Sequence, residues 1–125
     1  MNKIKTKTST VYIENDILRV DYMADVRISI SDAIENVEAE KELISSLIKM
    51  PLLVDIRNVK SIESEARDYF TGVESQQIIS KAALWTDSPI SNMIGNFFIG
   101  LNKGTVPVKL FSNKDKAITW LISND

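Results

Sequence analysis

The chain has 125 residues, of which 44% are hydrophobic and 26% are charged, and its formal net charge is −2. This composition is typical of one folded domain, and it excludes both a disordered chain and a strongly basic protein that follows a phosphate backbone. The chain contains no cysteine and no histidine, which excludes disulfides, thiol nucleophiles, Cys/His zinc sites and catalytic dyads that use histidine.

From these absences we expect a protein that is not an enzyme and that uses no cofactor, no metal and no nucleic acid. No apolar run approaches the ~20 residues of a membrane-spanning helix, so we expect no membrane span. We also expect a cytoplasmic location, with which the lack of cysteine agrees.

Residues 1–8 are polar and include three lysines, which predicts a flexible basic arm in front of a single domain over residues 9–125. Two β-rich segments follow, Val11–Glu14 and Ile17–Tyr22, and an Asn-Asp pair separates them. This pattern predicts an antiparallel hairpin. Val26, Ile28 and Ile30 alternate with polar residues, which indicates a third short extended segment.

The spacing of apolar residues predicts a helix that begins at Ser31–Asp32 and that Pro51 stops. Its apolar stripe includes Ile34, Val37 and Ile44, and its solvated stripe includes Glu35, Glu38 and Glu42. The nearly continuous apolar run Leu52–Ile56 predicts a parallel strand covered on both faces. We expect residues 57–60 to be a loop, followed by a helix from about Ser61–Ser64 to Gln77.

The last third of the chain repeats the alternation of strand and helix. Ala82–Trp85 and Val108–Phe111 are predicted strands, and the serine and proline of Ser88–Pro89 are typical of a helix start. The helix that follows has a predicted buried stripe of Ile90, Met93, Ile94, Phe97, Phe98 and Leu101. A capping arrangement at Ser112–Asp115 opens a final helix. The element order predicts an α/β sandwich with a mostly parallel central sheet, an N-terminal hairpin and about four helices.

Residues 52–65 (LLVDIRNVKSIESE) resemble the signature of STAS domains, the anti-anti-sigma factor family and its relatives. In that signature an apolar strand ends in Asp-Leu, and Ile-Asp-Ser-Ser-Gly opens a helix after a loop. Asp55 and Ile56 match the Asp-Leu pair, and Ser64 matches the first serine of the second motif. Leu53–Phe70 and Ser88–Lys103 are also similar to stretches of a small group of uncharacterised bacterial STAS-like proteins. The resemblance implies a STAS-like fold and a regulatory role through protein–protein contact.

This sequence departs from the family where the switch operates. The serine that is phosphorylated in the switch proteins corresponds to Glu65, and the glycine after it corresponds to Ala66. Glu65 therefore resembles a permanent negative charge in place of a switchable one. The resemblance implies a partner-binding surface made of Arg57, Asn58, Ser61, Ser64, Glu65 and Asp68, and the partner is another protein or a second copy of the chain. The alternative is that Ser61 and Ser64 only cap the helix while the glutamates complement its dipole.

A second candidate region lies where the parallel strands end, because ligands of open α/β sheets gather at that edge. The segments there supply Asp55, Asp87 and Ser88 together with Asn113. Ordinary capping and an ion pair between Asp55 and Arg57 explain these residues equally well. An enzyme that uses Asp55 or Asp87 is the least favoured hypothesis.

The helix after Pro89 contains two glycines, which each cost about 1 kcal/mol relative to alanine. Close packing on the sheet, a partner or a ligand would compensate for this cost. The residues that suggest a contact surface there are Asn92, Gly95, Asn96 and Ile99. The alternative function is therefore a domain that binds a small apolar, lipid-like ligand, as in CRAL-TRIO type domains, which the fold resembles.

Overall fold

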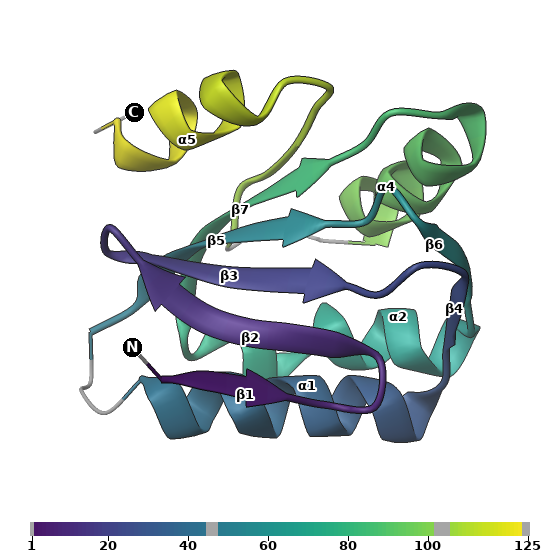
Figure 1. Cartoon of the computed structure of the whole chain (residues 1–125), viewed down its shortest axis with the longest axis horizontal. Coiled ribbons are helices and arrows are strands. Elements are labelled where there is room, and N and C mark those ends of the chain that lie inside the picture. The colour runs from purple at the N-terminus through teal and green to yellow at the C-terminus, as the bar shows by residue number, and fades with distance from the viewer. Residues whose placement is uncertain (1, 45–47, 102–105, 124–125) are drawn as a thin grey trace.

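A computed structural model describes residues 2–44, 48–101 and 106–123 (Figure 1). The strands are β1 Lys3–Lys5, β2 Ser9–Glu14, β3 Ile17–Tyr22, β4 Val26–Ile28, β5 Met50–Asp55, β6 Val59–Ile62, β7 Ile79–Trp85 and β8 Val108–Phe111. The helices are α1 Ile30–Leu43, α2 Ser64–Phe70, α3 Val73–Gln76, α4 Pro89–Leu101 and α5 Lys114–Ile122. None of these described helices is long and apolar enough to cross a membrane.

Six strands form the main sheet, in the order β1-β2-β3-β5-β7-β8. The pairs β1–β2 and β2–β3 are antiparallel, whereas β3–β5, β5–β7 and β7–β8 are parallel. Strands β4 and β6 form a separate parallel pair, which lies beyond the ends of β3 and β5 (Figure 1). This arrangement confirms the predicted α/β class with an N-terminal hairpin and a mostly parallel sheet.

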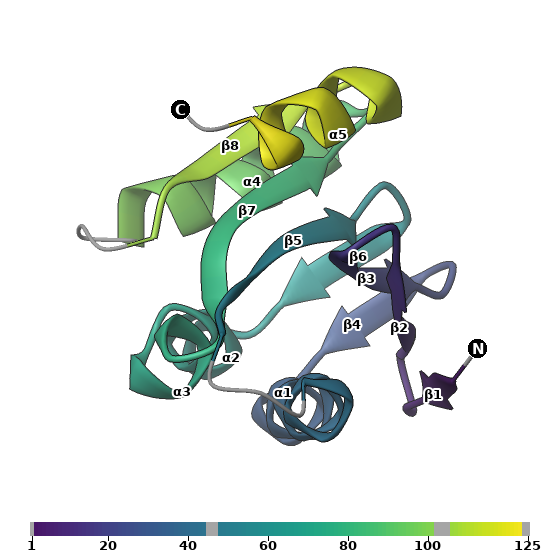
Figure 2. The same cartoon turned by 90° about the vertical axis from the view of Figure 1, so that its left-hand side faces the viewer.

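The two faces of the main sheet carry different layers. Helix α5 covers one face, and the other helices and the β4–β6 pair lie on the opposite side (Figure 2). The alternation along β3 serves both layers, because Leu18 and Val20 belong to the larger core whereas Ile17 packs with Leu53 and Leu121 under α5. The side of the sheet that carries α1 to α4 therefore holds most of the buried apolar residues.

Residues 3–5 form a strand that pairs with β2, whereas a flexible arm was predicted over residues 1–8. Strand β1 aligns Lys3 with Tyr12 and Lys5 with Thr10. Behind it, the buried Ser9 hydroxyl donates a hydrogen bond to the side chain of Asn36 on α1, at 2.5 Å. The prediction missed this strand because its side chains alternate between exposed lysines and the half-buried Ile4, which is a weak apolar pattern.

Two predicted helix boundaries were wrong. Helix α1 begins after Ser29, whose hydroxyl accepts a hydrogen bond from the Asp32 amide in a capping box, and it ends at Leu43. Pro51 lies inside β5 and therefore does not end the helix. Ile34, which was assigned to the apolar stripe, is 41% exposed.

The predicted loop over residues 57–60 and the long helix after it also differ from the structure. Residues 59–62 form β6, which pairs with β4 from a distant part of the chain. The helix is divided into α2 and α3, and Gly72 lies between them. The strand was missed because its partner is supplied by tertiary structure and its sequence also suits a loop.

Candidate functional site

The carboxyl ends of the parallel strands meet at one edge, as predicted. Asp21, Asp55, Trp85 and Phe111 lie in one row across β3, β5, β7 and β8. The segments that leave the strands also contact each other, since the Ile56 amide donates to the Trp85 carbonyl at 3.1 Å and the Thr86 amide donates to the Phe111 carbonyl at 2.9 Å. This edge is the first region in which a ligand could be bound.

Asp55 and Arg57 form an ion pair at this edge. The Arg57 Nε and Nη2 atoms each donate to one Asp55 carboxylate oxygen at 3.0 Å. The guanidinium group also lies 3.4 Å from the centre of the Trp85 ring. The hydrogen bonds that Arg57 donates to the Asp55 carboxylate raise the pKa of Arg57. Asp55 neutralises the charge of Arg57, so the pair has a structural role and offers no unpaired cation to an anionic ligand.

Three other polar side chains of this edge form hydrogen bonds at the beginnings of α4 and α5. The Ser88 hydroxyl accepts from the Ser91 amide at 3.1 Å, and the Thr86 hydroxyl donates to the Asn92 side chain at 2.6 Å. Asn113 accepts from the Lys116 amide at 3.0 Å at the start of α5. Asp87 is exposed. Within the part of the chain that the structure describes, no three acidic residues gather in a way that could hold a metal ion.

The predicted partner-binding residues lie around the start of α2. Ser64, Glu65 and Asp68 are exposed on α2, and Asn58 is exposed just before β6. Ser61 is half-buried within β6. The serine caps of the alternative interpretation were wrong, since the residue that precedes the helix is Glu63, and its carboxylate accepts from the Ile30 amide at 3.3 Å. Glu65 does lie in the first turn of α2, as the dipole part of that interpretation expected. The hydroxyl of Ser64 and the carboxylate of Glu65 are therefore available to solvent.

Helix α4 exposes Ile90, Met93 and Phe97, for which burial was predicted. Ile94 of the same predicted stripe is buried and Phe98 is half-buried, as predicted. Four of its apolar residues are among the exposed large hydrophobic side chains of the described chain: Ile90 (54%), Met93 (54%), Phe97 (43%) and Ile99 (43%). Asn92 and Asn96 are also exposed, so they share this outer half of the helix with the four apolar residues.

The inner half of α4 explains this orientation. Ser91, Ile94 and Gly95 face the sheet and are buried. A Cβ atom on Gly95 would lie only 2.9 Å from Leu110 Cδ2 of β8. The glycine thus permits close packing of the helix on the sheet, as one of the three sequence interpretations predicted, and it turns Ile90, Met93 and Phe97 outward.

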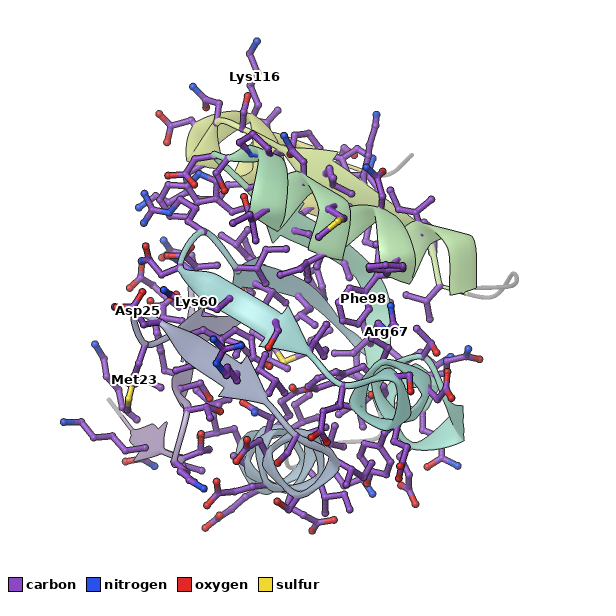
Figure 3. All side chains as sticks on the ribbon, turned by 90° about the vertical axis from the view of Figure 1, so that its right-hand side faces the viewer. Met23, Asp25, Lys60, Arg67, Phe98 and Lys116 are labelled. Atoms are coloured by element: carbon purple, nitrogen blue, oxygen red, sulfur yellow. The ribbon has the colours of Figure 1, made fainter. Side chains whose placement is uncertain are left out.

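Helices α2 and α4 contact each other through the later residues of α2. The Arg67 guanidinium lies 4.1 Å from the centre of the Phe97 ring, and the Phe70 and Phe98 rings are 6.0 Å apart. Figure 3 shows Arg67 and Phe98 in the region where the two helices meet. We use the name α2–α4 surface for the following exposed residues: Ser64, Glu65 and Asp68 of α2, and Ile90, Met93 and Phe97 of α4.

Glu40 is a chemically distinctive residue that the sequence analysis missed. It lies on α1, is only 3% exposed and borders a cavity of about 90 Å³ beneath the main sheet. Burial raises the pKa of its carboxyl group to about 8. A signal was present, because Glu40 follows Val37 by three positions and precedes Ile44 by four, which places it on the apolar stripe of the helix.

Comparison with known proteins adds the following. No curated protein matches the chain. A solved structure of an uncharacterised protein of the DUF3478 family from Shewanella loihica PV-4, described as having a SpoIIAA-like fold, is similar with a TM-score of 0.65 and 14% identity, over 90% of this chain and 91% of that chain. A protein of unknown function from Arthrobacter sp. FB24 is 24% identical over 95% of this chain and 96% of that chain, but its TM-score of 0.36 supports no argument about fold.

The first of these structures shows the STAS-like fold that the resemblance implied, and at 14% identity it shows the fold alone. The profile of one family, described as a domain of unknown function, matches residues 11–124, which is nearly the whole chain. The chain therefore belongs to the DUF7793 family of domains of unknown function.

Proposed function

We propose that the protein is a non-catalytic regulatory module that binds another protein through the α2–α4 surface. The observation that carries this proposal is the exposure of three large apolar side chains, Ile90, Met93 and Phe97, along one side of α4. Ile90 and Met93 are each 54% exposed. Single exposed apolar residues are ordinary, whereas a set of them on one face, rimmed by polar residues, is typical of an interaction site.

The exposed charges of α2 and of the turn before α4 indicate the chemistry of the partner. Glu65 and Asp68 are exposed on α2, and Asp87 is exposed just before α4. Arg67 is half-buried and lies against Phe97, so the exposed charges that α2 and the turn before α4 contribute to the rim are acidic. A partner with an apolar patch flanked by lysine or arginine would be complementary. In a symmetric dimer through this surface the acidic rims of the two copies would approach each other, which favours a different protein as the partner.

The resemblance to the switch proteins suggests how the surface is regulated. Glu65 stands where those proteins carry the phosphorylated serine, and a carboxylate has about half the charge of a phosphoserine. In this proposal the surface holds a permanent negative charge and binds its partner without a phosphorylation step. The proposed setting, the cytoplasm of a bacterium, follows from the same resemblance.

The test compares matched substitutions on two faces of the molecule. The partner is captured from the source cells with the full chain, purified, and measured by calorimetry. Ile90→Asp and Glu65→Lys should each weaken its binding by about tenfold or more. The matched controls lie on α5, on the other side of the sheet: Ile122→Asp replaces an isoleucine that is 65% exposed, and Asp115→Lys reverses an acidic residue in a first helical turn.

The proposal requires that both control variants bind the partner as the unmodified protein does. Circular dichroism must show that all four variants remain folded. Equal affinities for Ile90→Asp and Ile122→Asp would place the interface elsewhere. A dimer in light scattering that Ile90→Asp converts to a monomer would show that the surface binds a second copy instead.

A further inference from the structure

The cavity beneath the main sheet is lined almost entirely by apolar side chains. It has a volume of about 90 Å³. Leu52, Val54 and Leu84 line it from β5 and β7, and Phe70 and Phe98 line it from α2 and α4. Well-packed interiors contain few voids larger than a water molecule, so a void of this size in the larger core calls for an explanation.

One ionisable acidic group borders this cavity. Glu40 is the only acidic residue among the described residues that line it. Burial is the cause that raises the pKa of the carboxyl group to about 8, and no hydrogen bond or charge within the described chain adds to that shift. The carboxyl group is therefore mostly protonated at pH 7, with an O–H group that can donate a hydrogen bond.

No lysine or arginine is among the described residues that line the cavity with Glu40. Burial raises the pKa of Tyr22, and the negative charges of Glu40 and Asp32 raise it further, so these are the titratable groups that face one another. The other polar residues that line the cavity are Thr71, Ser75 and Gln76. An uncompensated polar group in an apolar site costs free energy, which a ligand with a suitable atom can recover.

We propose that this cavity binds a small uncharged organic molecule that has an apolar chain and one oxygen atom that accepts a hydrogen bond from Glu40, such as a short-chain alcohol or ketone. Apolar walls exclude charged molecules, because the walls offer nothing to replace the water around an ion. An apolar cavity of about 150 Å³ can hold benzene, so a cavity of about 90 Å³ suits a ligand of about four to five heavy atoms. This inference is independent of the protein-binding role.

The test uses three probes of equal chain length: butan-1-ol, butylammonium and butyrate. Each is titrated into the full chain, and the NMR signals of the Leu52, Val54 and Leu84 methyl groups are followed. Butan-1-ol should give saturable shifts, and the two ions should give none. Glu40→Leu, which removes the donor, should weaken butan-1-ol binding by about fivefold. Glu40→Gln retains an N–H donor and should bind within about twofold of the unmodified protein.

A pH series adds a second readout. Between pH 6 and pH 9 the affinity of the unmodified protein for butan-2-one, a ketone that can only accept a hydrogen bond, should fall, because Glu40 loses the proton that it donates. The affinity of Glu40→Gln for the same ketone should not change. The absence of saturable butan-1-ol shifts, as for a cavity that holds only water, would overturn the proposal. Equal affinity in Glu40→Leu, or tighter binding of butylammonium than of butan-1-ol, would overturn it as well. Ile90→Asp should bind butan-1-ol normally, which separates this site from the α2–α4 surface.

Discussion

The burial of Glu40 makes the stability of the protein depend on pH in a direction that can be worked out. Its pKa is about 8 in the folded state, against an ordinary value of 4.5. The folded state therefore keeps a proton that the unfolded state has already lost between these two values. A carboxyl group with a raised pKa in the folded state lowers stability as the pH rises through this window. Below pH 4.5 both states are protonated, and Glu40 has no effect on the pH dependence.

The size of the effect follows from the two pKa values. One pKa unit corresponds to about 1.4 kcal/mol, so Glu40 should lower the free energy of unfolding by about 3 to 4 kcal/mol between pH 5 and pH 8. Glu40→Gln removes the titration and keeps the shape of the side chain. The difference in unfolding free energy between the variant and the unmodified protein should therefore grow in favour of the variant by about this amount over the same range.

The assay is urea denaturation of both proteins at pH 5, 6, 7 and 8, followed by circular dichroism. Taking the difference between the proteins cancels the titration of groups that both share and that do not interact with Glu40. Tyr22 does interact with Glu40, but burial raises its pKa well above this pH range, so it stays protonated in the folded state throughout. A difference that stays constant with pH would refute the reasoning, since it would mean that Glu40 ionises in the folded state as readily as in the unfolded state. A difference that changes in the opposite direction would mean that the folded state favours the carboxylate.

Substitutions at two further positions test the packing of α4 on the sheet and the Asp55–Arg57 ion pair. In thermal denaturation, Gly95→Val should lower the free energy of unfolding by about 1 to 3 kcal/mol, because its branched side chain would collide with Leu110. Gly95→Ala should lower it clearly less, since alanine gains about 1 kcal/mol of helix propensity and the end of the Leu110 side chain can move. Arg57→Ala should lower the free energy of unfolding by about 1 to 2 kcal/mol in urea denaturation, because it removes both hydrogen bonds to Asp55 and the contact with Trp85. An unchanged urea midpoint would show that this pair adds nothing to stability.

The sequence by itself determined the class of the fold and the order of most of its elements, with β1 and β6 missed. Period-two and period-3.6 patterns of apolar residues mark the hairpin, the strands β5, β7 and β8, and the helices between them. The helix caps at Ser88 and Asn113 were also predictable, because each cap depends on residues close together in the sequence. The pairing of Asp55 with Arg57 was open to prediction for the same reason, since the two residues are only two positions apart.

Tertiary structure alone decided which partner each element meets. Strand β6 exists because β4, more than 30 positions earlier, lies beside it. The α4 pattern is apolar on both sides, and the close approach of Gly95 to Leu110 selects the side that is buried. Glu40 becomes an interior acid only because the sheet and α2 to α4 close over its helix. Periodicity reports how apolar a face is, but burial, exposure and a shifted pKa depend on what packs against that face.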